Sequence, residues 1–394
     1  MSTDLLFSTV EAGGNRRIGV AVLNRPESLN ALTLDMCRGL YQQLEQWEKD
    51  ESIALVVLTG SGDKAFCAGG DVRQLHASLG EAQPDDPWSN RHAREFFAEE
   101  YRLDYRIHYY TKPVLCWASG IVMGGGVGLM MGASHRVASE TTRFAMPETT
   151  IGVFPDVGGS WMFERLPAGI GMFLGLTGAQ LGAADCRHLG LVDYVMYSAG
   201  WPALKQALQT IEWTGDRHLD DVLLDRLLRS RSVSDTGAPG PLHKVYERIA
   251  DLCDGPDFEA ICQGIAHWQD ASNTWMARSA QAFMRASPGA ARLAFATQKK
   301  ARGLSLAEVF RMEYTVILRC VASPDFQEGV RALLIDKRKP PIWSPASFSE
   351  ADRHWADGFF EPCWPADVEH PLADLESAHR LRNPDQSELA VSMR

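Results

Sequence analysis

The chain has 394 residues, a hydrophobic fraction of 45% and a formal net charge of -11 at pH 7. This length and apolar content suit one large globular domain or two ordinary ones. The acidic balance argues against a general nucleic-acid or anionic-membrane surface, so we expect neither kind of partner and favour small-molecule chemistry.

Eight cysteines are scattered along the chain, without a C-x-x-C pair or a zinc-type Cys/His spacing. We therefore expect reduced thiols, no bound metal and a cytoplasmic location. The amino terminus has no basic start and no long apolar core, so no leader is expected. The uncharged stretch 114–134 contains six glycines, which favours a buried strand, loop and helix over a membrane span.

The first predicted elements alternate between strand and helix. A strand is predicted over 16–23, followed by a turn at 24–27. Apolar residues keep a helical period over 33–48, with Thr33 as N-cap. The continuous apolar run 53–58 predicts a strand covered on both faces, as in a parallel sheet.

Two glycine-rich turns each follow an apolar strand. The first, FCAGGD at 66–71, follows the strand 53–58, and the second, MGGGVG at 123–128, follows a predicted strand over 114–118 and precedes a possible helix start at 129–133. Taken singly, such turns are most typical of tight packing. As successive turns of one repeating architecture, they could bring two N–H donors to one ligand oxygen, which is an oxyanion hole.

Two acids follow the second glycine turn. Glu148 lies in MPET and Asp156 in FPDVGG, where prolines stiffen the turns and apolar neighbours lower the local dielectric constant. Carboxylates in such surroundings are candidate bases or nucleophiles, although a lone glutamate before threonine is more often solvated or capping. A charged helix over 91–110 carries Glu99 and Glu100, which by themselves would be interpreted as solvated.

The remainder of the chain is mainly helical in pattern. Helical pieces are predicted over 157–176, a helix over 183–189 and a short strand over 191–195. Further helices are expected over 291–300 and 304–322, after a linker at 235–241, whereas no structure is predicted from 336 onward. We expect a core domain at 1–197 and a mainly helical region at 198–394.

Other nucleotide and hydrolase motifs fit poorly. A dinucleotide fold requires G-x-G-x-x-G, yet Leu129 and Met131 occupy the third glycine slot, although Glu148 stands where a ribose-binding acid would be. Neither a P-loop nor a G-x-S-x-G elbow is present.

The motifs together carry a resemblance. NRPESLNAL, AFCAGGD, MGGGVG and FAMPET, in this order between residues 18 and 197, resemble the crotonase, or enoyl-CoA hydratase/isomerase, superfamily. IGVFPDVGGS, EEYRLDY and DFQEGVRALLIDK resemble its 3-hydroxyisobutyryl-CoA hydrolase branch. The resemblance implies an α/β fold, a crotonase-like spiral of ββα units with a helical C-terminal region.

The resemblance also implies roles for individual residues. Gly70 and Gly125 would donate the two N–H groups that bind the thioester oxygen. CoA, as part of the substrate and not as a cofactor, would lie along Gly70, Asp71, Val72 and Arg73 and the turn at 24–32. Arg25 and Arg73 could contact its phosphates, although each could equally be a plain surface charge.

The pattern of acids implies hydrolysis in preference to hydration. Superfamily hydratases carry a glutamate two residues after the glycine triplet, where this chain has Gly128. The hydrolase branch keeps Glu148 and adds Asp156 and Glu100 near the acyl group. Glu148 would attack the thioester carbonyl or activate a water that does, and Asp156 would position water or the substrate hydroxyl.

Two other functions stay open at this stage, an enoyl-CoA isomerase or hydratase and a non-catalytic binding protein of the same fold. The hydroxyacyl group is also open, because one methyl group separates 3-hydroxyisobutyryl-CoA from 3-hydroxypropionyl-CoA. A homo-oligomer is possible.

Overall fold

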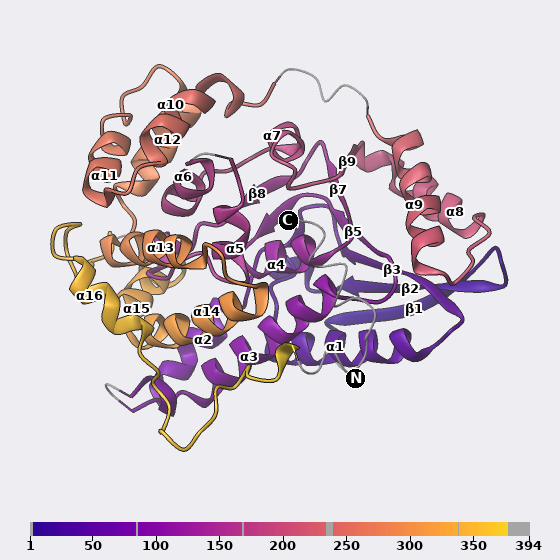
Figure 1. The fold of residues 1–394 in the computed structure, drawn as a ribbon, viewed down its shortest axis with the longest axis horizontal. Coiled ribbons are helices and arrows are strands. Elements are labelled where there is room, and N and C mark those ends of the chain that lie inside the picture. Colours follow the sequence, from indigo (N-terminus) through magenta and orange to yellow (C-terminus); the bar gives the residue numbers. More distant parts are fainter. Residues whose placement is uncertain (1–2, 84–85, 168, 234–238, 338, 377–394) are drawn as a thin grey trace.

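A six-stranded sheet with the order β1-β2-β3-β5-β7-β9 forms the centre of the fold in the computed structural model (Figure 1). The structure describes residues 3–83, 86–167, 169–233, 239–337 and 339–376. β1 and β2 pair antiparallel, and the remaining neighbours pair parallel. The strands of this sheet are β1 (Leu5–Ala12), β2 (Arg16–Leu23), β3 (Ile53–Gly60), β5 (Val114–Ala118), β7 (His135–Ser139) and β9 (Tyr194–Met196).

A second, three-stranded parallel sheet is formed by β4 (Ala65–Cys67), β6 (Ile121–Met123) and β8 (Arg143–Ala145). Each of its strands follows a long strand of the first sheet and precedes a helical segment. The helices are α1 (Leu34–Lys49), α2 (Val72–Ser78), α3 (Arg91–His108), α4 (Gly125–Gly132), the 3-10 helix η4 (Glu148–Ile151), α5 (Gly159–Glu164), α6 (Ile170–Thr177), α7 (Ala183–His188), α8 (Trp201–Gln209), α9 (Arg217–Arg231), α10 (Tyr246–Cys253), α11 (Phe258–Ala266), α12 (Thr274–Phe283), α13 (Pro288–Ala301), α14 (Leu306–Ala322), α15 (Pro324–Val330), the π-helix Arg331–Ile335 and α16 (Arg353–Asp357). This repeated strand, short strand and helix order confirms the predicted α/β spiral of ββα units.

The continuous apolar run of β3 has a simple cause. Val56 and Leu58 pack in the larger hydrophobic core, and Leu55 and Val57 pack in a second core on the opposite face. Because successive side chains of a strand point to opposite faces, a sheet buried on both sides requires apolar residues at every position. The prediction of a doubly covered strand at 53–58 is confirmed.

Local signals also placed α1 correctly. Its N-cap is Thr33, whose side chain accepts a hydrogen bond of 3.2 Å from the amide of Met36. The helix after the second glycine turn starts earlier than predicted, at Gly125 instead of 129, because Gly124 takes the N-cap position with φ of 50°. Only glycine adopts such a conformation readily. The strand β1 was not predicted.

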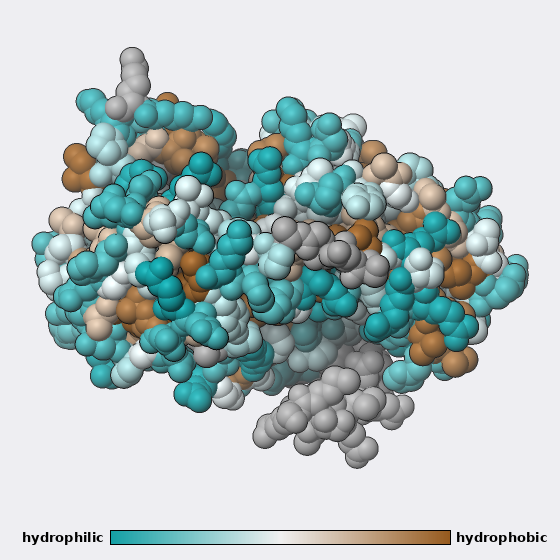
Figure 2. All heavy atoms as spheres, turned by 90° about the horizontal axis from the view of Figure 1, so that it is seen from above, coloured by the Kyte–Doolittle hydropathy of each residue, from teal (hydrophilic) through white to brown (hydrophobic). Residues whose placement is uncertain are grey.

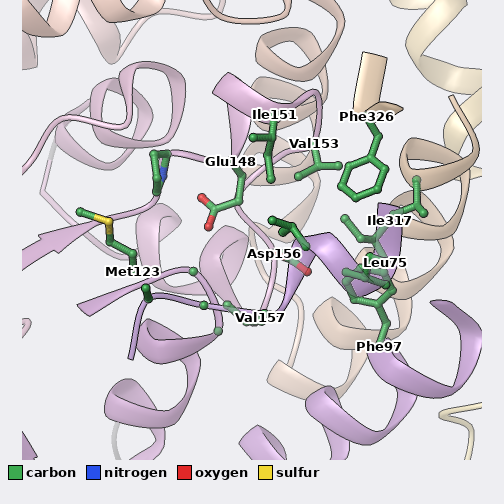
Figure 3. Close-up of a pocket in the computed structure, with 18 of the residues that line it drawn as sticks. Leu75, Phe97, Met123, Glu148, Ile151, Val153, Asp156, Val157, Ile317 and Phe326 are labelled. Carbon is green, nitrogen blue, oxygen red and sulfur yellow. The ribbon is translucent and has the colours of Figure 1, made fainter. Parts of the chain in front are cut away.

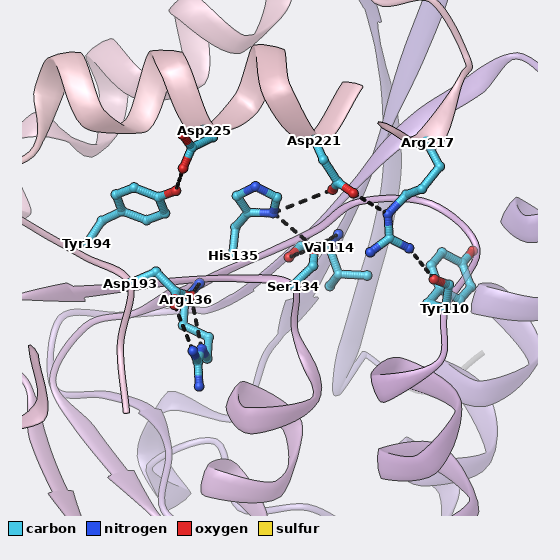
Figure 4. A network of polar contacts seen from close by, with 10 residues as sticks. All are labelled: Tyr110, Val114, Ser134, His135, Arg136, Asp193, Tyr194, Arg217, Asp221 and Asp225. Atoms are coloured by element: carbon cyan, nitrogen blue, oxygen red, sulfur yellow. Dashed lines mark hydrogen bonds and ion pairs between the residues drawn. The ribbon is translucent and has the colours of Figure 1, made fainter. Parts of the chain in front are cut away.

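Helix α9 is held against the sheet by a polar network (Figure 4). Arg217 bonds to the carbonyl oxygen of Tyr110 and to Asp221, and Asp221 lies 3.9 Å from the Nδ1 atom of His135. Tyr194 of β9 bonds to Asp225 of the same helix. These contacts tie α9 to the ends of β7 and β9.

The helices after residue 198 do not form a layer remote from the core. The amide of Ser287 donates to the carbonyl oxygen of Thr149 at 3.0 Å, and the hydroxyl of Tyr314 donates to the carbonyl oxygen of Arg94 at 3.2 Å. Figure 1 shows α13 beside α5 and α14 beside α3, with α15 next to α14 and α2. The domain boundary at 197/198 stays a prediction, and the part of the expected linker at 235–238 lies outside the described residues.

The surface is largely hydrophilic on the face that Figure 2 shows, with small and separate hydrophobic patches. In the described part of the chain, no helix combines the length and apolarity that a bilayer crossing requires. The stretch 114–134 forms the predicted strand and helix, β5 and α4, with the short strand β6 where a loop was expected. All eight cysteines are free thiols, and seven of them are buried.

Candidate active site

A cavity of about 270 Å³ lies where the two glycine turns meet α3, the segment 147–157 and the C-terminal helices. Glu148 and Asp156 both extend into it, as Figure 3 shows. The predicted residues Gly70, Val72, Glu100 and Gly125 line the same cavity. The spiral therefore brings together residues that are up to 86 positions apart, from 70 to 156.

The two glycine turns are in direct contact beside the cavity. A Cβ atom at Gly69 would lie 3.4 Å from the backbone nitrogen of Gly125 and 3.5 Å from the Cα atom of Gly124. Gly69 has φ of 102°, a conformation that side chains disfavour. Within the described residues, the amides of Gly70 and Gly125 donate no hydrogen bond to another protein group. Both donors are thus available to a ligand.

Glu148 begins η4 and is 8% exposed. A Cβ atom at Gly124 would lie 3.0 Å from its Oε1 atom, and its Oε2 atom has no hydrogen-bond partner. Burial raises the pKa of Glu148 well above its usual value, and the charge of Asp156 raises it further. These surroundings favour the neutral form of this carboxyl.

Asp156 is 7% exposed and accepts a hydrogen bond of 2.6 Å from the hydroxyl of Tyr101. Burial raises the pKa of Asp156 to about 6, although the bond from Tyr101 acts in the opposite direction. Two acids in one cavity with different pKa values can divide the roles of base and proton donor.

Glu100 lies on the buried face of α3 and is 2% exposed. Its Oε1 atom has no partner and lies 2.2 Å from the position of a Cβ atom at Gly125, so a side chain at 125 would have to displace this carboxyl. Burial raises the pKa of Glu100, as do Asp156, Asp104 and Glu148. Our interpretation of Glu100 as a solvated helix residue from local sequence is wrong, because α3 turns this side chain toward the cavity.

The expected CoA-binding residues lie at one side of the cavity. Asp71 caps α2 and forms a 3.0 Å ion pair with Arg25. Arg73 donates to the carbonyl oxygen of Leu334 at 3.4 Å. Both arginines therefore have protein partners, and their contacts with phosphates stay a prediction.

Sequence reasoning missed several residues of the site. Tyr101 binds Asp156, and Glu313 of α14 accepts hydrogen bonds of 2.7 and 2.9 Å from the amides of Gly158 and Ser160, which fixes the turn after Asp156. Burial raises the pKa of Glu313 to about 8. An acid within the apolar pattern of the predicted helix 304–322 was the available signal.

The apolar wall of the cavity was also missed. Leu75 and Phe97 approach Asp156 from the core, and Ile317 and Phe326 approach it from α14 and α15 (Figure 3). The C-terminal region thereby completes the cavity that the motifs begin. Such a cavity suits a small, mostly apolar group beside two carboxyls and two free amides.

In the part of the chain that the structure describes, no group of three or more His, Cys, Asp or Glu side chains is arranged to hold a metal ion. The chemistry that the geometry can support is acyl or proton transfer at a carbonyl whose oxygen accepts bonds from glycine amides.

Comparison with known proteins agrees with this geometry. The chain is 39% identical to "3-hydroxyisobutyryl-CoA hydrolase, mitochondrial" of Xenopus tropicalis over 342 residues, 87% of this chain and 86% of the relative. It is 34% identical to the human protein of the same name over 350 residues, 89% and 88% of the two chains.

Solved structures share the whole architecture. A carnitinyl-CoA dehydratase from Mycobacterium thermoresistibile has a TM-score of 0.80 and 31% identity, covering 94% of this chain and 99% of that structure. An enoyl-CoA hydratase from Rhodobacter sphaeroides has a TM-score of 0.76 and 31% identity, covering 91% and 98%. The family model described as Enoyl-CoA hydratase/isomerase matches residues 18–360, and the chain therefore belongs to this family.

Proposed function

We propose that the protein is an acyl-CoA thioester hydrolase and that its substrate is 3-hydroxyisobutyryl-CoA. The observation that carries the proposal is the pairing of two buried carboxyls, Glu148 and Asp156, with two free glycine amides in one cavity. The printed names of relatives with 34% and 39% identity over most of both chains support the same activity.

The proposed first step is attack by Glu148. The thioester oxygen accepts bonds from the amides of Gly70 and Gly125, which stabilise the negative charge that develops there, a term worth about 3 kcal/mol for each donor. Glu148 ionises by passing its proton to Asp156 and then bonds to the acyl carbon. The C–S bond breaks, and the CoA thiolate takes the proton from Asp156.

The second step returns the enzyme to its starting state. Asp156, now ionised, removes a proton from a water molecule, whose oxygen attacks the carboxyl carbon of Glu148 in the anhydride. The bond from this carbon to the acyl carboxylate breaks, which leaves Glu148 neutral. The acyl carboxylate takes the proton from Asp156, and the carboxylic acid product then loses it. The sum is thioester plus water giving carboxylate, CoA thiol and one proton. CoA takes part as a portion of the substrate, and the scheme requires no further cofactor.

The same geometry is also compatible with direct activation of water by Glu148. The two routes differ in where oxygen from water first appears. In a single turnover in ¹⁸O-water, the anhydride route places ¹⁸O in Glu148 and, after repeated turnovers, in the product. Mass spectrometry of the peptide that contains Glu148 would show no label if water attacks directly.

The alternative is an enoyl-CoA hydratase or isomerase, because the structural neighbours carry hydratase and dehydratase titles. A hydratase would carry a second glutamate at position 128 of α4. This chain has Gly128 there, and a Cβ atom at this position would lie 2.4 Å from the Oδ2 atom of Asp104. The remaining alternative, a non-catalytic binding protein, does not explain why carboxyls are buried in this cavity.

One assay separates these functions. Thiol release from a panel of short-chain acyl-CoAs, including the 3-hydroxyisobutyryl, 3-hydroxypropionyl and 3-enoyl compounds, is measured for the parent chain and for Glu148→Gln. We expect release from the two hydroxyacyl compounds and a loss of at least about 100-fold in Glu148→Gln. Conversion of the 3-enoyl compound without thiol release would support the isomerase, and inertness toward the whole panel would support the binding protein.

The place of this reaction in the cell is also a proposal. Its proposed product, a hydroxy acid, belongs to valine catabolism. The cysteines favour a cytoplasmic location, while the relatives' printed names are mitochondrial. A homo-oligomer stays a prediction.

A further inference from the structure

Three titratable residues repeat at intervals of four along α3. Glu100, Asp104 and His108 lie on one helix, one turn apart, so that neighbouring Cβ atoms are separated by about 5–6 Å. Glu100 lines the large cavity, and Asp104 and His108 line a smaller one. Glu100 and Asp104 are each 2% exposed, whereas His108 is half-buried. The series therefore runs from the active site toward the surface.

The smaller cavity lies directly behind the wall of the larger one. Its volume is about 30 Å³, and Val157 lines both cavities. One water molecule needs about 10–15 Å³ of such space and two or more polar partners. Asp104 provides them, because neither of its carboxyl oxygens has a hydrogen-bond partner among the described residues. A buried carboxyl without partners is costly unless a water or a proton compensates it.

The geometry meets a requirement of the proposed reaction, on which this inference rests. Each turnover leaves one proton behind when the carboxylic acid product ionises. The large cavity is apolar along much of its wall, and the bound CoA thioester would fill its mouth while the acid forms. A second exit for the proton is therefore useful, and only polar groups or water can provide one.

We propose that Glu100, Asp104 and His108, joined by water in the smaller cavity, conduct the product proton from the active site to the surface. In one transfer, Glu100 accepts the proton from the acid and passes its own to Asp104. Asp104 passes a proton through the water to the imidazole of His108, which releases it to solvent. No oxidant or cofactor takes part, and each group returns to its starting state.

The surroundings of Asp104 agree with this role. The titratable groups that act on it or on Glu100 from other elements are all acidic or neutral: Asp156, Glu148, Glu313 of α14 and Cys37 of α1. Residues 125–132 of α4, which cover Asp104, contain no titratable side chain. Burial raises the pKa of both Asp104 and Glu100, which favours the protonated form that a relay requires.

The surroundings of His108 differ from those of Asp104. The ring of His108 lies edge-on to Trp161, with 5.6 Å between ring centroids. The guanidinium of Arg165 lies over the Trp161 ring, 4.0 Å from its centroid. Tyr109 is another neighbouring titratable group, at 4.7 Å between ring centroids. A guanidinium thus lies beside the aromatic partner of His108, whereas the groups named around Asp104 are acidic or neutral.

The test compares Asp104→Asn and His108→Gln with the parent chain by thiol release at low buffer concentration. Asparagine preserves the shape of the aspartate but cannot pass on a proton. We expect kcat to fall at least about tenfold in both variants, with KM unchanged. Added imidazole should restore His108→Gln, because a soluble base can replace the surface end of the relay, but should not restore Asp104→Asn.

His92→Gln is the matched control. His92 is also half-buried on α3, stacked on Phe96 at the opposite end of the helix, and lines neither cavity. Its kcat should stay at the parent value at every imidazole concentration. Thermal unfolding verifies the fold of each variant. If Asp104→Asn fails to fold, His108→Gln alone tests the relay, because its half-buried side chain can be replaced with less effect on the core.

The outcomes separate the relay from the proposed function. Parent-level kcat in both variants, without any dependence on imidazole, would overturn the relay and leave the hydrolase intact. Absence of thiol release by the parent chain would overturn the hydrolase and the relay with it.

Discussion

The hydroxyl of Tyr101 is expected to set the acidic limb of the pH profile. It donates a bond of 2.6 Å to Asp156 in a buried setting, and substitution to phenylalanine removes this bond while keeping the ring between Phe97 and Phe310. A hydrogen bond to a charged group contributes about 1.5–3 kcal/mol. At about 1.4 kcal/mol per pKa unit, its loss raises the pKa of Asp156 by roughly one to two units.

The sign follows from the proposed mechanism. The Glu148 and Asp156 pair must carry one negative charge, and its first ionisation is that of Asp156, with a pKa of about 6. The value of kcat/KM therefore falls as the pH drops through this pKa. In Tyr101→Phe the acidic limb should move up to about pH 7–8, which lowers kcat/KM roughly tenfold at about pH 6.5 and changes it little at about pH 8.5.

Tyr105→Phe is the control, since Tyr105 lies one turn further along α3, is 6% exposed and packs against Tyr109 and Phe310. Its acidic limb should match that of the parent. The assay is thiol release from 3-hydroxyisobutyryl-CoA between pH 5 and 9 in buffers of constant ionic strength. An acidic limb that stays in place in a folded Tyr101→Phe would refute the assignment of this limb to Asp156.

Three further predictions test the site. In Gly125→Ala, the Cβ atom would lie 2.2 Å from Glu100 and displace the amide of residue 125. The kcat for thiol release should therefore fall about 100-fold or more, while the circular dichroism spectrum stays unchanged. A kcat equal to that of the parent would exclude this amide from the oxyanion site. Gly128→Ala would place its Cβ atom 2.4 Å from the Oδ2 atom of Asp104. This overlap should lower the free energy of unfolding, measured in urea, by about 1–3 kcal/mol. A variant as stable as the parent would show that the Asp104 side chain moves freely. Glu313 has a pKa of about 8 in the folded protein, above its value in the unfolded chain, so the free energy of unfolding should fall as the pH rises from about 4.5 to 8. Glu313→Gln should flatten this slope. Identical slopes in the variant and the parent would contradict protonation of Glu313 in the folded protein.

Local motifs correctly predicted the residues whose roles depend on their immediate neighbours in the chain. Thr33 caps a helix, and Gly124 adopts a conformation that only glycine tolerates, because such preferences act over a few residues. Alternation and apolar runs likewise predicted β3 and β5 with nearly correct bounds. The order of these motifs was sufficient to indicate the family and to select Gly70, Gly125, Glu148 and Asp156 as one candidate site.

Tertiary structure alone decided which distant groups join that site. Tyr101 and Asp104 follow Glu100 on α3, yet nothing in their spacing shows that one bonds to Asp156 and the other lines a second cavity. Glu313 reaches the site from a helix more than 150 residues further along the chain. Periodicity reports which face of an element is buried, whereas the distance between two buried faces depends on packing. The pKa values depend on those distances, so the acidity of the site belongs to the fold and not to any motif.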